Sequence, residues 1–190
     1  MSHEGDCWIS GNAYVCGGAY IGDDARVNRN ASVGGNVMVR ENAKVSGDAR
    51  ASGNVRINGD AYIGEDAYVG GNARIGGNVR IGGNAEICGI AYADGDAKIG
   101  GNVRIGGNTR IGGDAEVVGD ALVYEGEYTS TIINFTLPQY SITVLSTGKL
   151  QIGCQLKTVQ EWKTTTLEQA VEMGLKKENY ELFMKYINIF

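Results

Sequence analysis

Several features that mark common functional classes are missing from this sequence of 190 residues. The formal net charge is −5, whereas domains that hold nucleic acid electrostatically usually have a basic balance or a basic patch. No apolar run approaches the roughly 18 residues needed to span a bilayer, and no basic segment followed by an apolar core opens the chain. We therefore expect a soluble, cytoplasmic protein with no membrane contact, although a local basic stripe remains compatible with the composition.

Cysteine is also scarce, with four residues in the chain. Cys7, Cys16, Cys88 and Cys154 lie far apart and form none of the CxxC pairs that mark zinc sites and redox motifs. Free thiols in a reducing compartment are therefore expected, and no metal site is predicted.

The abundant feature is a six-residue repeat. From Gly5 to Tyr124 the chain divides into 20 consecutive units without insertion or deletion. The third position is mostly Ala and the fifth is almost always Ile or Val, which predicts the in-out-in alternation of a short strand. Gly at position one and Asn or Asp at position two predict the turn, because these residues tolerate the left-handed backbone conformation.

One strand and one turn every six residues predict a solenoid. Such a sequence cannot form hairpins of useful register, but it can wind into a triangular coil of three units, about 18 residues per turn, at the ~4.8 Å strand spacing. Twenty units give nearly seven coils. We therefore predict an all-β solenoid, a parallel β-helix over residues 1–124, followed by a small α+β unit over residues 125–190.

The composition of the C-terminal unit differs from that of the repeat, since Gly thins out and Thr, Leu, Gln and Lys rise. Residues 141–145 and 150–154 flank a turn and predict a hairpin. Residues 158–161 and 166–169 fit the capping box that opens a helix. The apolar residues of 180–187 follow helical spacing. The unit is predicted to contain a hairpin and two or three short helices.

This unit is expected to cap the open end of the coil, because an uncovered sheet edge invites aggregation. Trp162, Tyr186 and Phe190 are assigned to its core, since packing is the default role of aromatic residues in a small unit. Partner binding by these three residues is the alternative.

The unbroken Gly-Asn-Ala-Xaa-Val pattern resembles the hexapeptide-repeat left-handed parallel β-helix family, which includes many acyltransferases. Residues 2–9 together with the repeat are further similar to uncharacterised repeat proteins common in phages and prophages. The family resemblance implies a left-handed coil. The narrower resemblance implies a phage-type binding protein in the host cytoplasm that binds and inhibits a host defence protein.

The catalytic residues of the family do not carry over. Acyltransferases of this fold use a histidine general base and often a loop that breaks the repeat, but His3 is the only histidine here and lies outside the first unit. Carbonic anhydrases of the same fold need three imidazoles around a metal. Glycine-rich strings such as 76–83 lack the helix that follows a phosphate loop. We therefore predict a non-catalytic binding or scaffold protein without a cofactor. An acyltransferase-like enzyme is the alternative.

The outward-facing fourth positions form three ladders, because residues 18 apart stack on successive coils. Basic side chains dominate the ladders, and Asp and Glu occupy the corners. The ladder richest in residues that protein interfaces favour contains Tyr20, Met38, Arg56, Arg74, Tyr92 and Arg110, with Tyr128 as a candidate continuation. We predict a protein partner on this face. Two alternatives stay open: the side chains only support the sheet, or they stack nucleobases and pair phosphates of a nucleotide or nucleic acid.

The N-terminal end predicts self-association. Four residues precede the first unit, too few to cover the apolar end of a coil, and such ends are normally covered or paired. A second copy can cover it. We therefore expect a homo-oligomer, a dimer or trimer, with Cys7 and Trp8 at or near the contact.

Overall fold

The computed structural model describes residues 2–124, 126–129, 133–136, 141–144, 149–152 and 155–188. The chain forms two compact units, Met1–Ile132 and Ile133–Phe190. None of the helices in the described ranges has the length and apolar content needed to cross a lipid bilayer.

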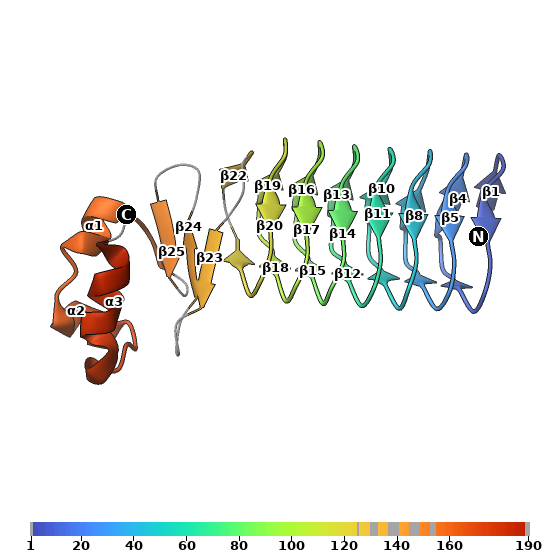
Figure 1. Cartoon of the computed structure of the whole chain (residues 1–190). Coiled ribbons are helices and arrows are strands. Elements are labelled where there is room, and N and C mark those ends of the chain that lie inside the picture. Colours follow the sequence, from blue (N-terminus) through green and yellow to red (C-terminus); the bar gives the residue numbers. More distant parts are fainter. Residues whose placement is uncertain are drawn as a thin grey trace. The chain divides into compact units, whose positions relative to one another are not determined.

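The first unit is a left-handed parallel β-helix of about seven coils, as predicted (Figure 1). Each hexapeptide contributes one short strand, and successive strands join three parallel sheets in turn, here named sheets A, B and C. A coil therefore takes three hexapeptides, and strand partners lie 18 residues apart, as in the pairing of Arg56 with Arg74.

The strands of the three sheets have the following bounds. Sheet A consists of β1 (Ser2–Glu4), β4 (Tyr20–Gly22), β7 (Met38–Val39), β10 (Arg56–Ile57), β13 (Arg74–Ile75), β16 (Tyr92–Ala93), β19 (Arg110–Ile111) and β22 (Glu127–Tyr128). Sheet B consists of β2 (Trp8–Ile9), β5 (Arg26–Val27), β8 (Lys44–Val45), β11 (Tyr62–Ile63), β14 (Arg80–Ile81), β17 (Lys98–Ile99) and β20 (Glu116–Val117). Sheet C consists of β3 (Tyr14–Val15), β6 (Ser32–Val33), β9 (Arg50–Ala51), β12 (Tyr68–Val69), β15 (Glu86–Ile87), β18 (Arg104–Ile105) and β21 (Leu122–Val123).

The third and fifth positions fill the interior of the coil, as the repeat predicts. Small and branched side chains alternate there, for example Ala61 and Ile63, and both are fully buried. The polar Thr109 also lies inside, where its hydroxyl donates to the carbonyl oxygen of Gly106 at 2.7 Å. That bond removes the cost of burying the hydroxyl without a partner.

Backbone hydrogen bonds join each coil to the next. The N–H groups at positions four and six donate to carbonyls at positions three and five one coil further on; Arg56 N lies 3.0 Å from the oxygen of Ala73 and Asn58 N 3.0 Å from that of Ile75. Position two donates in the same way to position one. The backbone hydrogen bonding between coils therefore continues through the corners.

The corners correct one prediction. Within the described residues of the coil, positive φ is confined to the first position of the repeat and to Gly126, and Asn or Asp at position two does not adopt it. Position two instead forms side-chain ladders: the Asn36 amide donates to Asn54 at 3.0 Å, and Asn54 donates to Asn72 at 3.0 Å. The amide thus stabilises coil stacking, while the left-handed turn falls to the preceding residue.

Two further features at the ends of the coil were not predicted. Residues before the first unit form β1, which pairs with β4 so that His3 lies opposite Ile21. At the other end, Tyr128 does not continue the outward ladder of sheet A. The register shifts by one residue, Glu127 lies opposite Arg110, and Tyr128 lies opposite Ile111 with its side chain buried. A one-residue slip moves a strand residue to the other face.

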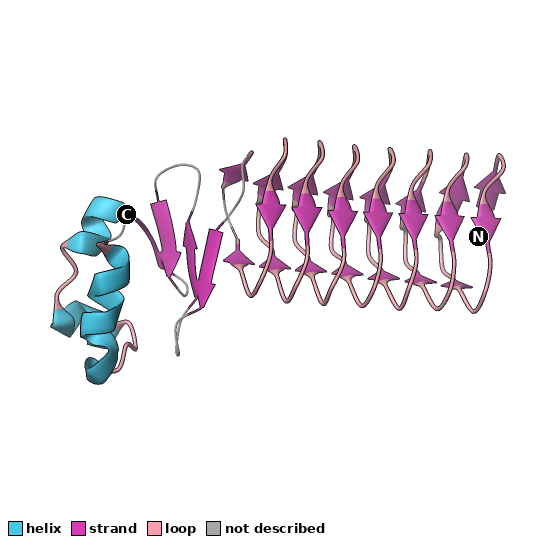
Figure 2. Ribbon diagram, viewed as in Figure 1, coloured by secondary structure: helices cyan, strands magenta, loops and turns pink. Residues whose placement is uncertain are grey.

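The second unit contains an antiparallel sheet and short helices (Figure 2). The strands, in spatial order, are β23 (Ile133–Thr136), β24 (Ser141–Val144), β25 (Lys149–Ile152) and β26 (Gln155–Thr158). The helices are α1 (Val159–Lys163), α2 (Leu167–Glu172), the 3-10 helix η1 (Lys177–Asn179) and α3 (Tyr180–Ile187). The predicted hairpin is confirmed for β24 and β25, and both capping boxes are present, at Thr158 and Thr166.

Trp162 is the centre of the core of this unit, as predicted. Its indole N–H donates to the carbonyl oxygen of Leu150 at 2.8 Å, and its ring meets that of Phe183 edge-on at 5.9 Å between centroids. Ile187 is buried in the same cluster. The side chain of Tyr186, and all of Cys154 and Phe190, lie outside the described residues. That this unit caps the coil stays a prediction.

Gly53 tests the glycine requirement of the corners. Its φ is +90°, and a Cβ built there would lie 2.6 Å from the carbonyl oxygen of Gly71. We expect Gly53→Ala to lower the free energy of unfolding by about 1–2 kcal/mol relative to Gly100→Ala, whose Cβ would meet nothing within 4 Å. Urea denaturation of the two variants measures the difference. Equal stabilities would show that the corner does not need glycine.

Candidate binding surface

The six residues of the predicted binding face lie on consecutive strands of sheet A. Direct register pairs link Tyr20 with Met38, Met38 with Arg56, Arg56 with Arg74, and Arg74 with Tyr92. Arg110 follows Tyr92 on the next coil. Each occupies the outward position of its strand, so the structure brings all six together in a single ladder.

The middle of this ladder is hollowed into a shallow groove of about 500 Å³. Its lining residues are Met38, Arg40, Glu41, Arg56, Ile57, Asn58, Arg74, Ile75, Gly76, Gly77, Tyr92 and Asp94. The hollow reaches the corner between sheets A and B at Gly76, where a Cβ would lie 3.2 Å from Asn58 and 3.7 Å from Asp94. Because glycine leaves that space open, the groove extends from the sheet onto the corner.

Arg56 and Arg74 form the floor of the groove, and both are exposed. Among the described residues, neither guanidinium has an ion pair. Their Cα atoms are register partners, about 4.8 Å apart at the strand spacing, and like charges directly opposite each other destabilise a sheet. An anion placed between the two guanidinium groups would relieve that repulsion.

Tyr92 forms one wall, and its ring is held in place. The phenol donates to Oδ2 of Asp94 at 2.8 Å, while Oδ1 of Asp94 accepts from the Gly95 N–H at 2.7 Å. The Arg110 guanidinium lies 5.8 Å from the ring centroid. The hydrogen bond to Asp94 raises the pKa of the Tyr92 phenol above its ordinary value, with burial and the Asp94 charge acting in the same direction. The groove therefore has a fixed aromatic wall.

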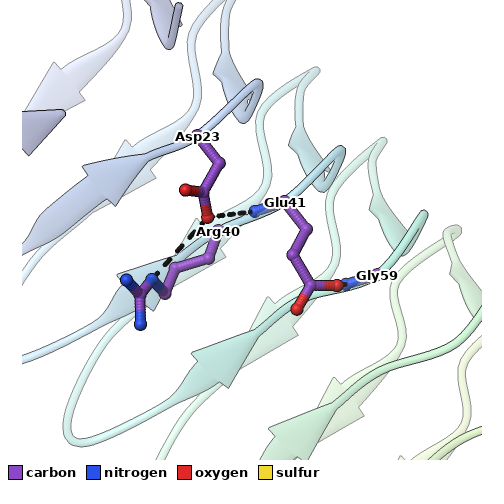
Figure 3. Close-up of polar contacts among 4 residues, drawn as sticks. All are labelled: Asp23, Arg40, Glu41 and Gly59. Atoms are coloured by element: carbon purple, nitrogen blue, oxygen red, sulfur yellow. Dashed lines mark hydrogen bonds and ion pairs between the residues drawn. The ribbon is translucent and has the colours of Figure 1, made fainter. Parts of the chain in front are cut away.

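The opposite rim is built from charged corner residues (Figure 3). Asp23 accepts from the Glu41 N–H at 3.0 Å and pairs with Arg40 at 3.7 Å, and Glu41 accepts from the Gly59 N–H at 2.6 Å. Arg40 also lies over the ring of Tyr20, 5.2 Å from its centroid. Glu65 accepts from the Gly83 N–H in the same manner at another corner. A carboxylate at a left-handed corner thus bonds the next coil.

The corner residues of the groove were missed in the sequence. Arg40, Asn58 and Asp94 each lie two residues after a ladder residue, at position six of the repeat. The sequence does indicate that these residues are exposed, since position six varies more than the buried positions three and five. They were missed because only the fourth positions of the repeat were assigned to the surface.

The other two faces differ from sheet A. On sheet B a hollow of about 480 Å³ is lined by Asp60, Asn78, Arg80, Asp96 and Lys98, where acids accompany both basic residues. On sheet C, Arg104 pairs with Glu86 at 3.6 Å. Adjacent basic residues without an ion pair among the described residues also occur on sheet B, where Arg80 pairs in register with Lys98. What distinguishes the sheet A groove is that both basic residues are arginines and that Met38 and Tyr92 flank them on the same ladder.

The predicted oligomer contact lies on the first coil. Trp8 is 62% exposed on β2, Cys7 is half-buried, and Tyr14 on β3 is 63% exposed. Trp8 also lines a hollow of about 300 Å³ together with Arg26 and Asn28. Large apolar side chains exposed this far are available for a contact.

Within the part of the chain that the structure describes, no group of three or more His, Cys, Asp or Glu side chains could hold a metal ion. Burial, followed by the nearby Glu86 charge, raises the pKa of the Cys88 thiol and favours the unreactive protonated form. The side chain of His3 lies outside the described residues.

The comparisons with known proteins leave the family open. No protein-family model matches the chain. No curated protein matches it either. Among solved structures, the chain is similar to the UDP-N-acetylglucosamine acyltransferase from Campylobacter jejuni, with 15% identity, a TM-score of 0.31, and coverage of 97% of this chain and 83% of that one. A likeness at this level carries no argument about function.

The wall formed by Tyr92 can be tested through its titration. We expect Asp94→Asn to lower the pKa of the Tyr92 phenol toward its ordinary value, because the carboxylate that stabilises the protonated phenol is gone. Asp96→Asn removes an equal charge from the same corner without touching Tyr92 and serves as the control. NMR titration of the Tyr92 ring measures both. An equal pKa shift in the two variants would contradict the bond.

Proposed function

We propose that this chain is a non-catalytic binding protein whose partner docks on the groove of sheet A. The observation that supports the proposal most directly is the pair Arg56 and Arg74, which lie adjacent and exposed in a groove with no ion pair among the described residues. Such a pair costs the isolated protein stability, and a partner would offset that cost. Tyr92 and Met38, which flank the pair, belong to residue types enriched at interfaces.

An acyltransferase-like enzyme is the competing function. Acyl transfer needs a base within hydrogen-bond reach of the acceptor, and His3 is the only histidine that could serve. No histidine lines the sheet A groove, and its two carboxylates are engaged in hydrogen bonds, Glu41 with the Gly59 N–H and Asp94 with the Tyr92 phenol and the Gly95 N–H. Turnover of acetyl- or acyl-CoA by the purified chain would favour the enzyme over the binding protein.

The class of partner follows from the surface, whereas phage origin and inhibition of a host protein rest on the sequence resemblance. A groove that lies open along a sheet face leaves much of an occupant exposed, so it suits a protein better than a small ligand, because small ligands bind in pockets that bury most of their surface. We accordingly propose a protein partner. A nucleotide or nucleic acid remains the alternative for the same arginines.

Capture of a partner from a cell lysate tests the proposed surface. We expect Arg56→Glu, Arg74→Glu and Tyr92→Ser together to reduce capture about tenfold or more while leaving the fold intact, because outward positions tolerate substitution. The matched control lies on three consecutive coils of sheet B: Lys98→Glu, Arg80→Glu and Tyr62→Ser.

The two triple variants make the same change in charge and remove one tyrosine each. A partner retained by the sheet B variant and lost by the sheet A variant supports the proposed surface. Equal capture by both, or loss in both, would contradict it. Circular dichroism checks that each variant stays folded.

We also propose that the chain forms a homo-oligomer through its first coil, where Trp8 and Tyr14 are strongly exposed. Burying one Trp at a contact contributes on the order of 2 kcal/mol. Trp8→Asp is therefore expected to lower the mass seen by light scattering, whereas Ile90→Asp, at a side chain that is 64% exposed on a middle coil, should leave it unchanged. A wild-type chain that is monomeric at micromolar concentration would refute the proposal.

A further inference from the structure

The charge pattern around the sheet A groove identifies the chemistry of the partner. Among the charged residues that line it, three are arginines, Arg40, Arg56 and Arg74, and two are acids, Glu41 and Asp94. Arg40 is paired with Asp23, whereas Arg56 and Arg74 on the floor are not paired among the described residues. The free positive charge is therefore concentrated on two adjacent coils.

One edge of sheet A is acidic along its length. The corner between sheets A and B has Asp or Glu at one or more positions on most coils, namely Asp23, Asp24, Glu41, Asp60, Asp94, Asp96 and Asp114. The opposite corner, between sheets C and A, has uncharged residues on the coils that flank the groove, among them Asn54, Asn72 and Ile90. The groove is thus a positive centre with a negative rim on one side.

This pattern disfavours a polyanion. A nucleic acid that ran along the ladder would contact Arg56, Arg74 and Arg110, but the acidic corner would lie beside it on most of the same coils. Like-charge contacts of that kind cost binding energy and reject wrong partners. A small free anion would fill only a small part of the groove of about 500 Å³ and would leave most of its lining without a contact.

The spacing of the arginines matches an α-helix. Their strands lie about 4.8 Å apart, and residues at i and i+4 of a helix have Cβ atoms about 5–6 Å apart on one face. Two Glu residues with that spacing can therefore each meet one guanidinium. A basic residue on the neighbouring face of the same helix would then lie over Glu41 or Asp94.

We propose that the sheet A groove docks an α-helix of a partner protein, with a pair of acidic residues over Arg56 and Arg74 and a basic residue over the acidic corner. The inference rests on the binding function proposed above and names the class of partner. Tyr92, the register partner of Arg74 on the next coil, is fixed by Asp94 and Arg110 and supplies an aromatic ring on which the helix packs beyond the arginines.

The probe is an Ala-based helical peptide longer than about 15 residues, with two Glu residues at i and i+4 and one Lys on the adjacent face. NMR signals of the Arg56 and Arg74 side-chain N–H groups report binding. We expect saturable shifts that weaken as salt is added. The same peptide with Gln in place of both Glu residues should bind about tenfold more weakly.

Variants of the full chain complete the test. Arg56→Gln with Arg74→Gln should weaken peptide binding about tenfold, and the control pair Arg80→Gln with Lys98→Gln on sheet B should not. Equal binding of the Glu and Gln peptides would overturn the inference. So would an oligothymidylate that binds the two arginines more tightly than the Glu peptide.

The outcomes separate this inference from the proposed function. If the sheet A triple variant loses its captured partner but the Glu peptide gives no shift, the surface binds a protein of another chemistry and only the inference fails. If the triple variant retains its partner, the proposed function fails whatever the peptide does. Peptide shifts together with loss of capture support both.

Discussion

The β-helix depends on backbone hydrogen bonds between successive coils, in which donor and acceptor residues lie 17 apart, as in the bond from the Arg56 N–H to the Ala73 carbonyl. Positions two, four and six of each hexapeptide donate to the next coil, so the bonding runs through the corners as well as the strands. This continuity requires every coil to have the same length and every corner to turn in the same way. The left-handed first position meets that requirement, and the buried Ala and Ile or Val follow from it, because only small and branched side chains fill so narrow an interior.

The groove of sheet A is a consequence of the same constraint. Since the backbone is fixed by its repeat, surface variation falls mainly on the side chains at positions four and six, with a few charged residues at position one and Ile90 at position two. Gly76 and Gly77 remove bulk from one corner, and Arg56, Arg74 and Tyr92 on adjacent strands define what remains. Asp94 then holds Tyr92 through two hydrogen bonds of its own. These few side chains, on a backbone set by the repeat, therefore determine the shape of the groove.

The repeat made the fold and the ladder predictable. A strict period identifies inward and outward positions without knowledge of long-range contacts, which is why Met38, Arg56, Arg74 and Tyr92 could be assigned to one face. Prediction failed where the period ends, at Tyr128. The last coil is one residue shorter than the 18-residue period, so the side chain of Tyr128 lies on the inner side of sheet A and not on the outer one. It also failed for the role of Asn at position two. Asn tolerates a left-handed backbone and equally well forms a side-chain ladder, and composition alone does not choose between them.

Because the period is 18 residues throughout the repeat, whole coils of the β-helix can be removed or inserted. Removal or insertion of one whole coil leaves every remaining strand, corner and ladder in register, since each coil bonds only to its two neighbours. The arginine pair occupies two adjacent coils, and the other residues that line the groove lie within one coil on either side. A segment of about four coils therefore contains the whole groove. The number of coils in the rest of the β-helix can therefore change in evolution without altering the lining of the groove.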